Sequence, residues 1–114
     1  MSENQEPAAP ELRDGAPIPS DAISDALTRA PFAYTDGTAQ VFTSDGRTTF
    51  TERDGRNSTG EWGVDEHGRF WSFWPPSYRA EYDVSWIADD GQAVGVRFVE
   101  RARGTSSEGR YAGR

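Results

Sequence analysis

Residues 36–62, DGTAQVFTSDGRTTFTERDGRNSTGEW, carry the clearest structural signal in this sequence. Asp-Gly steps recur there every nine residues, at Asp36-Gly37, Asp45-Gly46 and Asp54-Gly55. Asp-Gly between alternating residues is a strong short-range signal for a tight β-hairpin. The spacing therefore predicts a meander of short antiparallel strands in the middle of the chain.

Strand-like runs continue on both sides of this stretch. We expect strands at about residues 32–35, 39–44, 47–53, 57–65, 69–74, 80–88, 93–101 and 107–112. Further turns are predicted at DEHG (65–68), WPPS (74–77), DDGQ (89–92) and RGTS (103–106). Because these connections are short, neighbours in sequence should pair in antiparallel fashion.

Alternation along the strands predicts one buried face and one wet face. Apolar residues occupy alternate positions in three of the expected strands: Trp62 and Val64; Tyr82, Val84 and Trp86; and Val94, Val96 and Phe98. Such a sheet can curl around its own core, which also removes its edges. The predicted fold is all-β, an antiparallel up-and-down meander or small β-barrel of seven to eight strands, with Trp62 and Trp86 as core rings.

One short helix should precede the strands. Ser20 is a suitable N-cap before AISDALTRA (22–30), and Pro31 ends the pattern, so we place the helix at about residues 21–29. Residues 1–20 are rich in Pro, Ala and acids and predict a disordered arm. Residues 21–112 then form a single barrel-like domain.

Composition narrows the classes of partner. The formal net charge of −7 would repel a phosphate backbone, so no nucleic-acid partner is expected. There is no Cys, hence no disulfide or thiolate site. Because no apolar run of signal-peptide length precedes the strands, we expect a soluble, cytoplasmic protein with no membrane partner.

Calcium-binding nonapeptide repeats share the nine-residue spacing of the Asp-Gly steps, but they need paired glycines and a fixed ligand Asp. We therefore expect neither metal nor cofactor.

The segment WPPSYR, residues 74–79, brings several ring side chains and an arginine together. Mouths of small barrels commonly admit ligands, and amphipathic rings with an arginine suit a small molecule that carries an aromatic or carboxylate group. We therefore take Trp71, Trp74, Tyr78 and Arg79 as candidate ligand-binding residues. In the alternative interpretation, the rings complete the core and Arg79 pairs with Glu81 or Asp83.

Catalysis has little support in the sequence. The single histidine, His67, lies in an expected turn, and no Ser or Thr has a base at an interpretable spacing. Acid–base chemistry would require Glu52, Glu61 or Asp83 to turn inward beside Arg79 or Tyr82. We therefore name no catalytic residue.

The run STGEWGVDEHGRFWSFWPPSYRAEYDVSW (58–86), with GRY at 109–111, resembles small bacterial β-meander proteins. In these proteins a G-x-W strand, a D-x-x-G-R-F hairpin and a W-P step recur. GEW followed by antiparallel strands and preceded by a helix more distantly resembles lipocalin-like and streptavidin-like barrels. That resemblance implies a barrel that holds a small hydrophobic ligand.

Two functional hypotheses remain from the sequence. The first is a small-molecule-binding protein with an aromatic pocket, since rings outnumber aliphatic residues in the expected domain. The second is a protein-interaction module or homodimer that uses the acidic arm and an exposed aromatic face. RFWSFW (69–74) suggests such a face, because Phe70 and Trp74 point to one side and Trp71 and Phe73 to the other.

Overall fold

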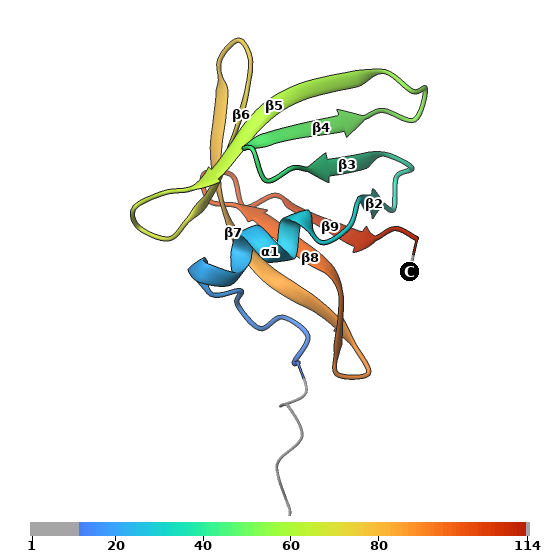
Figure 1. Cartoon of the computed structure of the whole chain (residues 1–114), viewed down its shortest axis with the longest axis vertical. Coiled ribbons are helices and arrows are strands. Elements are labelled where there is room, and N and C mark those ends of the chain that lie inside the picture. The colour runs from blue at the N-terminus through green and yellow to red at the C-terminus, as the bar shows by residue number, and fades with distance from the viewer. Residues whose placement is uncertain (1–11, 114) are drawn as a thin grey trace, which may run out of the picture.

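The structure is a computed structural model that describes residues 12–113. Within that part of the chain, eight antiparallel strands follow one another in chain order and the last pairs with the first, closing a barrel (Figure 1). The strands are β2 (Phe32–Tyr34), β3 (Ala39–Phe42), β4 (Arg47–Thr51), β5 (Asn57–Val64), β6 (Phe70–Trp74), β7 (Tyr78–Asp89), β8 (Gln92–Glu100) and β9 (Ser106–Tyr111). The predicted all-β meander is confirmed, and it is a closed barrel.

The recurring Asp-Gly steps form hairpins with three-residue loops, at 35–37, 44–46 and 53–55. Glycine ends each loop with a φ near +90°, a left-handed conformation that suits a residue without a Cβ. The Asp before it accepts a hydrogen bond from the backbone N–H two residues on. Among the described residues, a two-residue turn with positive φ at both positions occurs instead at Asp90-Gly91.

The short helix is present and is preceded by a 3₁₀ turn (Ser20–Ala22). α1 spans Ile23–Thr28, and the predicted Ser20 cap is wrong, because neither helix start has a side-chain cap hydrogen bond. α1 contacts β3 and β5, and Ser20 lies against Gly68 in the β5–β6 turn. The helix therefore covers the end of the barrel that holds this turn. No helix of residues 12–113 is long and apolar enough to cross a membrane.

Residues 12–18, which the sequence placed in the arm, run along β7. The backbone N–H of Ile18 donates to the Val84 carbonyl at 3.2 Å, and the N–H of Trp86 donates to the Ala16 carbonyl at 2.9 Å. β6 pairs only with the first part of β7, up to Tyr82, so this segment pairs with the part of β7 that β6 leaves free. The rest of the predicted arm, residues 1–11, lies outside the described residues.

The hydrophobic core lies at the helix-covered end of the barrel. It consists of rings and aliphatic side chains from the segment before the helix, from α1 and from the strands: Ile18, Ile23, Ala26, Leu27, Phe32, Phe42, Trp62, Phe70, Val84, Trp86, Val96, Phe98 and Tyr111. Trp62 and Trp86 are buried, as the alternation predicted. Some rings meet edge to face, as for Phe42 and Trp62 with centroids 5.7 Å apart, and others stack, as for Phe32 and Tyr111 with centroids 5.1 Å apart. One end of the barrel is thus filled.

Candidate ligand-binding cavity

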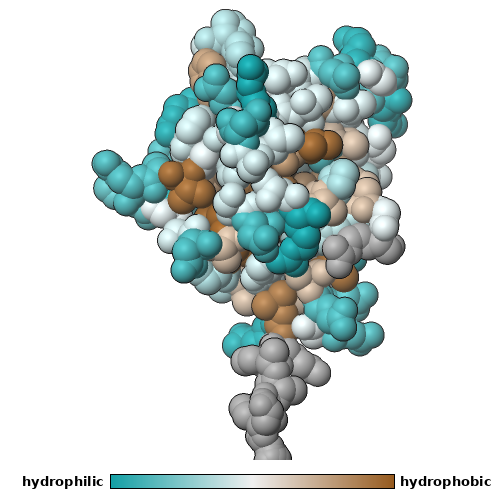
Figure 2. Space-filling model, in the orientation of Figure 1, coloured by the Kyte–Doolittle hydropathy of each residue, from teal (hydrophilic) through white to brown (hydrophobic). Residues whose placement is uncertain are grey.

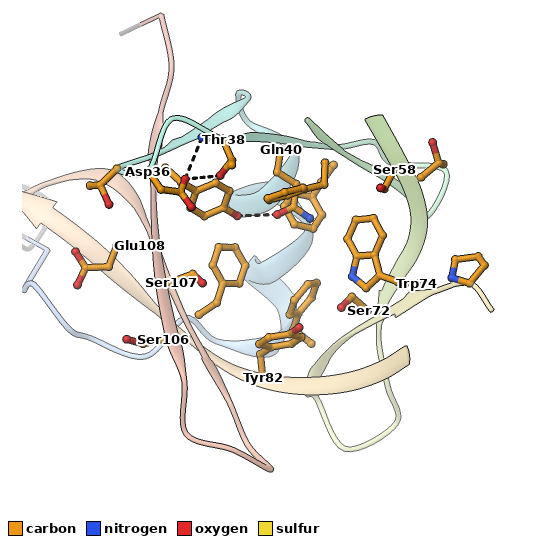
Figure 3. Close-up of a pocket in the computed structure, with 18 residues that line it drawn as sticks. Asp36, Thr38, Gln40, Ser58, Ser72, Trp74, Tyr82, Ser106, Ser107 and Glu108 are labelled. Carbon is orange, nitrogen blue, oxygen red and sulfur yellow. Dashed lines mark hydrogen bonds between the residues drawn. The ribbon is translucent and has the colours of Figure 1, made fainter. Parts of the chain in front are cut away.

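The other half of the barrel interior contains a cavity of about 780 Å³ (Figure 3). Every strand contributes to its walls, and its mouth lies among the β2–β3 turn, the start of β5, the end of β6 and the start of β9. The lining residues are Tyr34, Thr35, Asp36, Thr38, Gln40, Phe42, Phe50, Ser58, Thr59, Phe70, Ser72, Trp74, Pro75, Tyr82, Phe98, Ser106, Ser107 and Glu108. Ligand pockets of proteins are commonly about 300 to 1,000 Å³, so a small molecule fits.

Rings form much of the cavity wall. Phe50 lies between Tyr34 and Trp74, with centroid distances of 6.2 Å and 6.5 Å. Phe70 and Phe98, which also belong to the core, form the floor where the cavity meets the filled half. These surfaces favour an apolar or aromatic ligand.

A chain of hydrogen bonds fixes one wall. The Tyr34 hydroxyl donates to Gln40 Oε1 at 2.7 Å, and Gln40 Nε2 donates to Thr48 Oγ1 at 2.9 Å. Thr48 Oγ1 in turn donates to the Val41 carbonyl at 2.9 Å. Burial, with smaller contributions from Tyr82 and Asp36, raises the pKa of the Tyr34 hydroxyl. Tyr34 is therefore a neutral, oriented phenol at physiological pH.

The wall formed by β6 and β7 has polar groups without protein partners. The Ser72 side chain is inward-facing and 3% exposed, yet its hydroxyl makes no hydrogen bond with any residue of 12–113. The same holds, within the described residues, for the Trp74 indole N–H and the Tyr82 hydroxyl. Figure 3 shows these three side chains on the side of the cavity away from Thr38 and Gln40. Three hydrogen-bonding groups thus face the cavity.

Glycines let two of the cavity rings lie close to the barrel wall. A Cβ at Gly60 would lie 2.7 Å from the Trp74 ring and 2.5 Å from the Phe73 carbonyl oxygen. A Cβ at Gly109 would lie 3.1 Å from the Tyr34 ring. Both glycines are buried, so each ring lies flat where a side chain would otherwise stand.

Two acids border the mouth, and both have partners. The Thr38 hydroxyl and backbone N–H donate to Asp36, and these bonds lower the pKa of the Asp36 carboxyl. Glu108 accepts a hydrogen bond from Arg97 Nε at 2.9 Å. No arginine or histidine is among the described residues that line the cavity.

The residues chosen from WPPSYR separate in space. Trp74 lines the cavity. Trp71 lies on the outer face over Gly63, with the Arg79 guanidinium 5.2 Å above its ring. Arg79 also donates to Glu81 at 3.2 Å, the pairing of the alternative interpretation.

Tyr78 lies outside the cavity as well. It is 38% exposed, and its hydroxyl donates to Glu100 at 2.7 Å, which raises the pKa of the phenol. Of the four candidate residues, the structure therefore places only Trp74 at the cavity.

The sequence interpretation missed most of the cavity wall. Gln40, Thr48 and Ser72 occupy inward positions of their strands, where the alternation calls for apolar residues. Polar residues at such inward positions were the sequence signal for a cavity, because a fully packed barrel interior is normally apolar. From the sequence, the rings of Tyr34, Phe50 and Tyr82 could be interpreted only as part of the core.

The groups considered for acid–base chemistry lie away from the cavity. Glu52, Glu61 and Asp83 are exposed, and Asp83 accepts a hydrogen bond from Arg101 at 2.7 Å. His67 is exposed beside Glu66. Within residues 12–113, no group of three His, Asp or Glu side chains is placed to hold a metal ion. Away from the mouth, the polar groups that line the cavity are therefore hydroxyls, an amide and an indole N–H.

No protein-family model, curated protein or solved structure matches the chain.

Proposed function

We propose that this protein binds a small hydrophobic or aromatic molecule inside the barrel. The observation that carries the proposal is the cavity of about 780 Å³ between the rings of Tyr34, Phe50 and Trp74. A filled interior would have served stability better, because buried rings and close packing contribute most of the free energy of folding in a small domain. The retained space is what a binding function requires.

Several features support a binder. The cavity is bounded by a closed barrel and a filled core, so its shape is largely preformed. Preformed sites bind without a large ordering cost. Apart from the Asp36 and Glu108 carboxylates at the mouth, the polar groups that face it are hydroxyls, an amide and an indole, which orient a ligand without reacting with it.

The proposal can be tested with N-phenyl-1-naphthylamine, an uncharged fluorophore that brightens in apolar sites. We expect saturable binding with one molecule per chain. Ser58→Phe, which adds a ring at an inward position of β5, should weaken binding about tenfold or more, because the added volume occupies the cavity.

Glu61→Phe is the matched control, since Glu61 is an exposed residue of the same strand. It should leave the dissociation constant unchanged. Absence of saturable binding, or equal weakening by the two variants, would show that the cavity is not a binding site.

The second hypothesis, an interaction module or homodimer, has a weaker basis. Trp71 and Phe73 are on the outer face but only partly exposed, and Arg79 covers Trp71. On the face drawn in Figure 2, hydrophobic residues form small separate areas among hydrophilic ones. Light scattering tests this alternative: a dimer that Trp71→Ser dissociates would support it.

A further inference from the structure

The cavity interior is electrically neutral. Among the described lining residues, the carboxylic acids are Asp36 and Glu108. Both lie at the mouth and accept hydrogen bonds from the protein. No cationic side chain lines it. An anionic ligand would lose its hydration and find no cationic side chain, and a cationic ligand would find counter-charge only in the two carboxylates at the mouth, which are already hydrogen-bonded; either is costly in a ring-lined interior. The chemistry of the walls therefore disfavours ions in the interior.

Among the lining side chains that are buried or half-buried, the hydroxyl and indole groups without a partner in the described part of the chain lie on one wall, whereas the unpartnered hydroxyls of Ser58, Thr59, Ser106 and Ser107 are exposed at the mouth. Ser72 is nearly fully buried and has no partner within residues 12–113, although buried hydroxyls almost always have one. Trp74 can only donate, through its indole N–H, and Tyr82 can donate through its phenol. All three lie on β6 and β7 and face the same space (Figure 3). Together they form a site for an acceptor atom.

On the opposite wall the Tyr34 and Thr38 hydroxyls already donate to the protein, and the second amide N–H of Gln40 is the donor left free within the described residues. The Tyr34 proton is used on Gln40, and the Gln40 amide is held by Thr48. The Tyr34 oxygen is left to accept, so this wall offers an oriented acceptor. The two walls are thus complementary in their hydrogen-bonding character.

We propose that the cavity selects uncharged aromatic molecules that carry a hydrogen-bond acceptor such as a carbonyl oxygen, which binds to Ser72, Trp74 and Tyr82. The ligand ring then lies among Phe50, Phe70 and Phe98, and a ligand donor, where present, points to Tyr34. This inference rests on the proposed binding function and specifies its ligand class.

Four probes on one naphthalene skeleton test the selection, with dissociation constants measured by equilibrium dialysis. They are 2-acetylnaphthalene, 2-ethylnaphthalene, 2-naphthoate and 2-naphthylmethylammonium. The ketone should bind about tenfold or more tightly than either ion, because only the ions lose charge hydration. It should bind roughly threefold to tenfold more tightly than the ethyl compound, which lacks the acceptor.

Variants locate the acceptor site. Ser72→Ala and Tyr82→Phe should each reduce the preference for the ketone over the ethyl compound by about threefold, with little change in binding of the ethyl compound itself. Ser44→Ala, an exposed turn position at the helix-covered end, is the control and should change neither constant.

The outcomes separate the two proposals. If none of the four probes binds, the binding function itself fails. If probes bind but an ion binds as tightly as the ketone, the function stands and the neutral ligand class is overturned. If the ketone preference survives both Ser72→Ala and Tyr82→Phe, the acceptor site on β6 and β7 is wrong.

Discussion

The two halves of the barrel interior contain the same residue types, but they differ in the hydrogen bonds that the polar atoms of these residues make. In the half covered by α1, the Trp62 indole N–H donates to the Thr43 carbonyl at 3.0 Å, and the Tyr111 hydroxyl donates to the Ala26 carbonyl at 2.6 Å. In the open half, Trp74 and Tyr82 have no hydrogen-bond partner among the described residues. Trp62 and Tyr111 thus differ from Trp74 and Tyr82 in having protein partners, although the indole N–H of Trp86, in the covered half, also has no hydrogen-bond partner among the described residues.

The difference separates the groups that hold the fold from those available to a ligand. A buried donor with a protein partner contributes to stability, and its loss leaves the partner unsatisfied. A donor that faces a cavity without such a partner contributes little to the folded state. Removing side chains should therefore be costly in the covered half and nearly neutral in the open half.

Removal of the two tryptophans gives the largest contrast. Trp62→Ala should lower the free energy of unfolding by about 3 to 5 kcal/mol, because it removes a large buried ring from a packed core. Trp74→Ala should cost no more than about 1 kcal/mol, since this ring is only partly buried beside the cavity. Urea unfolding of both variants measures the difference, and equal losses would contradict the division into two halves.

A smaller effect is expected from filling the close approach under Trp74. In Gly60→Ala the new Cβ would meet the Phe73 carbonyl oxygen at 2.5 Å and the Trp74 ring at 2.7 Å. Overpacking of this kind costs about 1 to 3 kcal/mol, and here it should also displace Trp74 and weaken binding of N-phenyl-1-naphthylamine. Glu61→Ala, at the exposed neighbouring position that does not line the cavity, is the control for stability and binding. Unchanged binding in Gly60→Ala would show that the position of Trp74 is unimportant.

Tyr111 and Tyr82 allow the contribution of a single hydroxyl to stability to be compared between the two halves. Tyr111→Phe should cost about 1 kcal/mol, because it breaks the bond to the Ala26 carbonyl in α1. Tyr82→Phe should change the free energy of unfolding by less than about 0.5 kcal/mol. Thermal or urea unfolding measures both, and a loss at Tyr82 as large as that at Tyr111 would indicate that Tyr82 has a structural partner.

The smallest effect is expected in the pH dependence of stability, to which both ends of the barrel should contribute. Hydrogen bonds in the turns lower the pKa values of Asp36, at the mouth, and of Asp45 and Asp65, at the helix-covered end, below the ordinary 3.8. The principal donors are, in order, the Thr38 hydroxyl, the Thr43 hydroxyl and the Arg69 backbone N–H.

Because these carboxyls have lowered pKa values in the folded state, their stabilising contribution is present above pH 3.8 and is lost as the pH falls through the folded-state values. The free energy of unfolding, measured from about pH 6 to about pH 2.5, should therefore fall at the acid end. Asp36→Asn and Asp45→Asn should each reduce that fall by a similar amount. A flat profile in the unchanged protein would argue against the turn hydrogen bonds.

Local chemistry explains how much of the fold was predictable. The predicted strand boundaries agree with the structure to within about two residues throughout, because turns at residues such as Gly46 and Gly68 need a positive φ in any surroundings. Alternation likewise identified Trp62 and Trp86 as buried, since a strand directs successive side chains to opposite faces. The loop length at Asp45-Gly46 was harder to predict from the sequence. The Arg47 N–H donates a hydrogen bond to the Asp45 side chain, and this bond stabilises a longer connection.

The candidate site was predictable only in part. Trp71 and Arg79 are close to Trp74 in sequence, but they occupy outward positions of β6 and β7 and contact each other there. A motif that runs along strands delivers alternate side chains to opposite faces, so sequence proximity could not bring all of them to one site. Face assignment would have separated Trp74 from the other two.

The order of the hairpins, the buried faces and the short helix follow from the sequence, because they depend on residues a few positions apart. Three features depend on residues far apart: the pairing of β2 with β9, the pairing of residues 15–18 with β7, and the cavity itself. A cavity is the space that remains when side chains from every strand have met, and α1 filled one end while leaving the other open. That balance of volumes is a property of the closed barrel and has no counterpart in any local stretch of sequence.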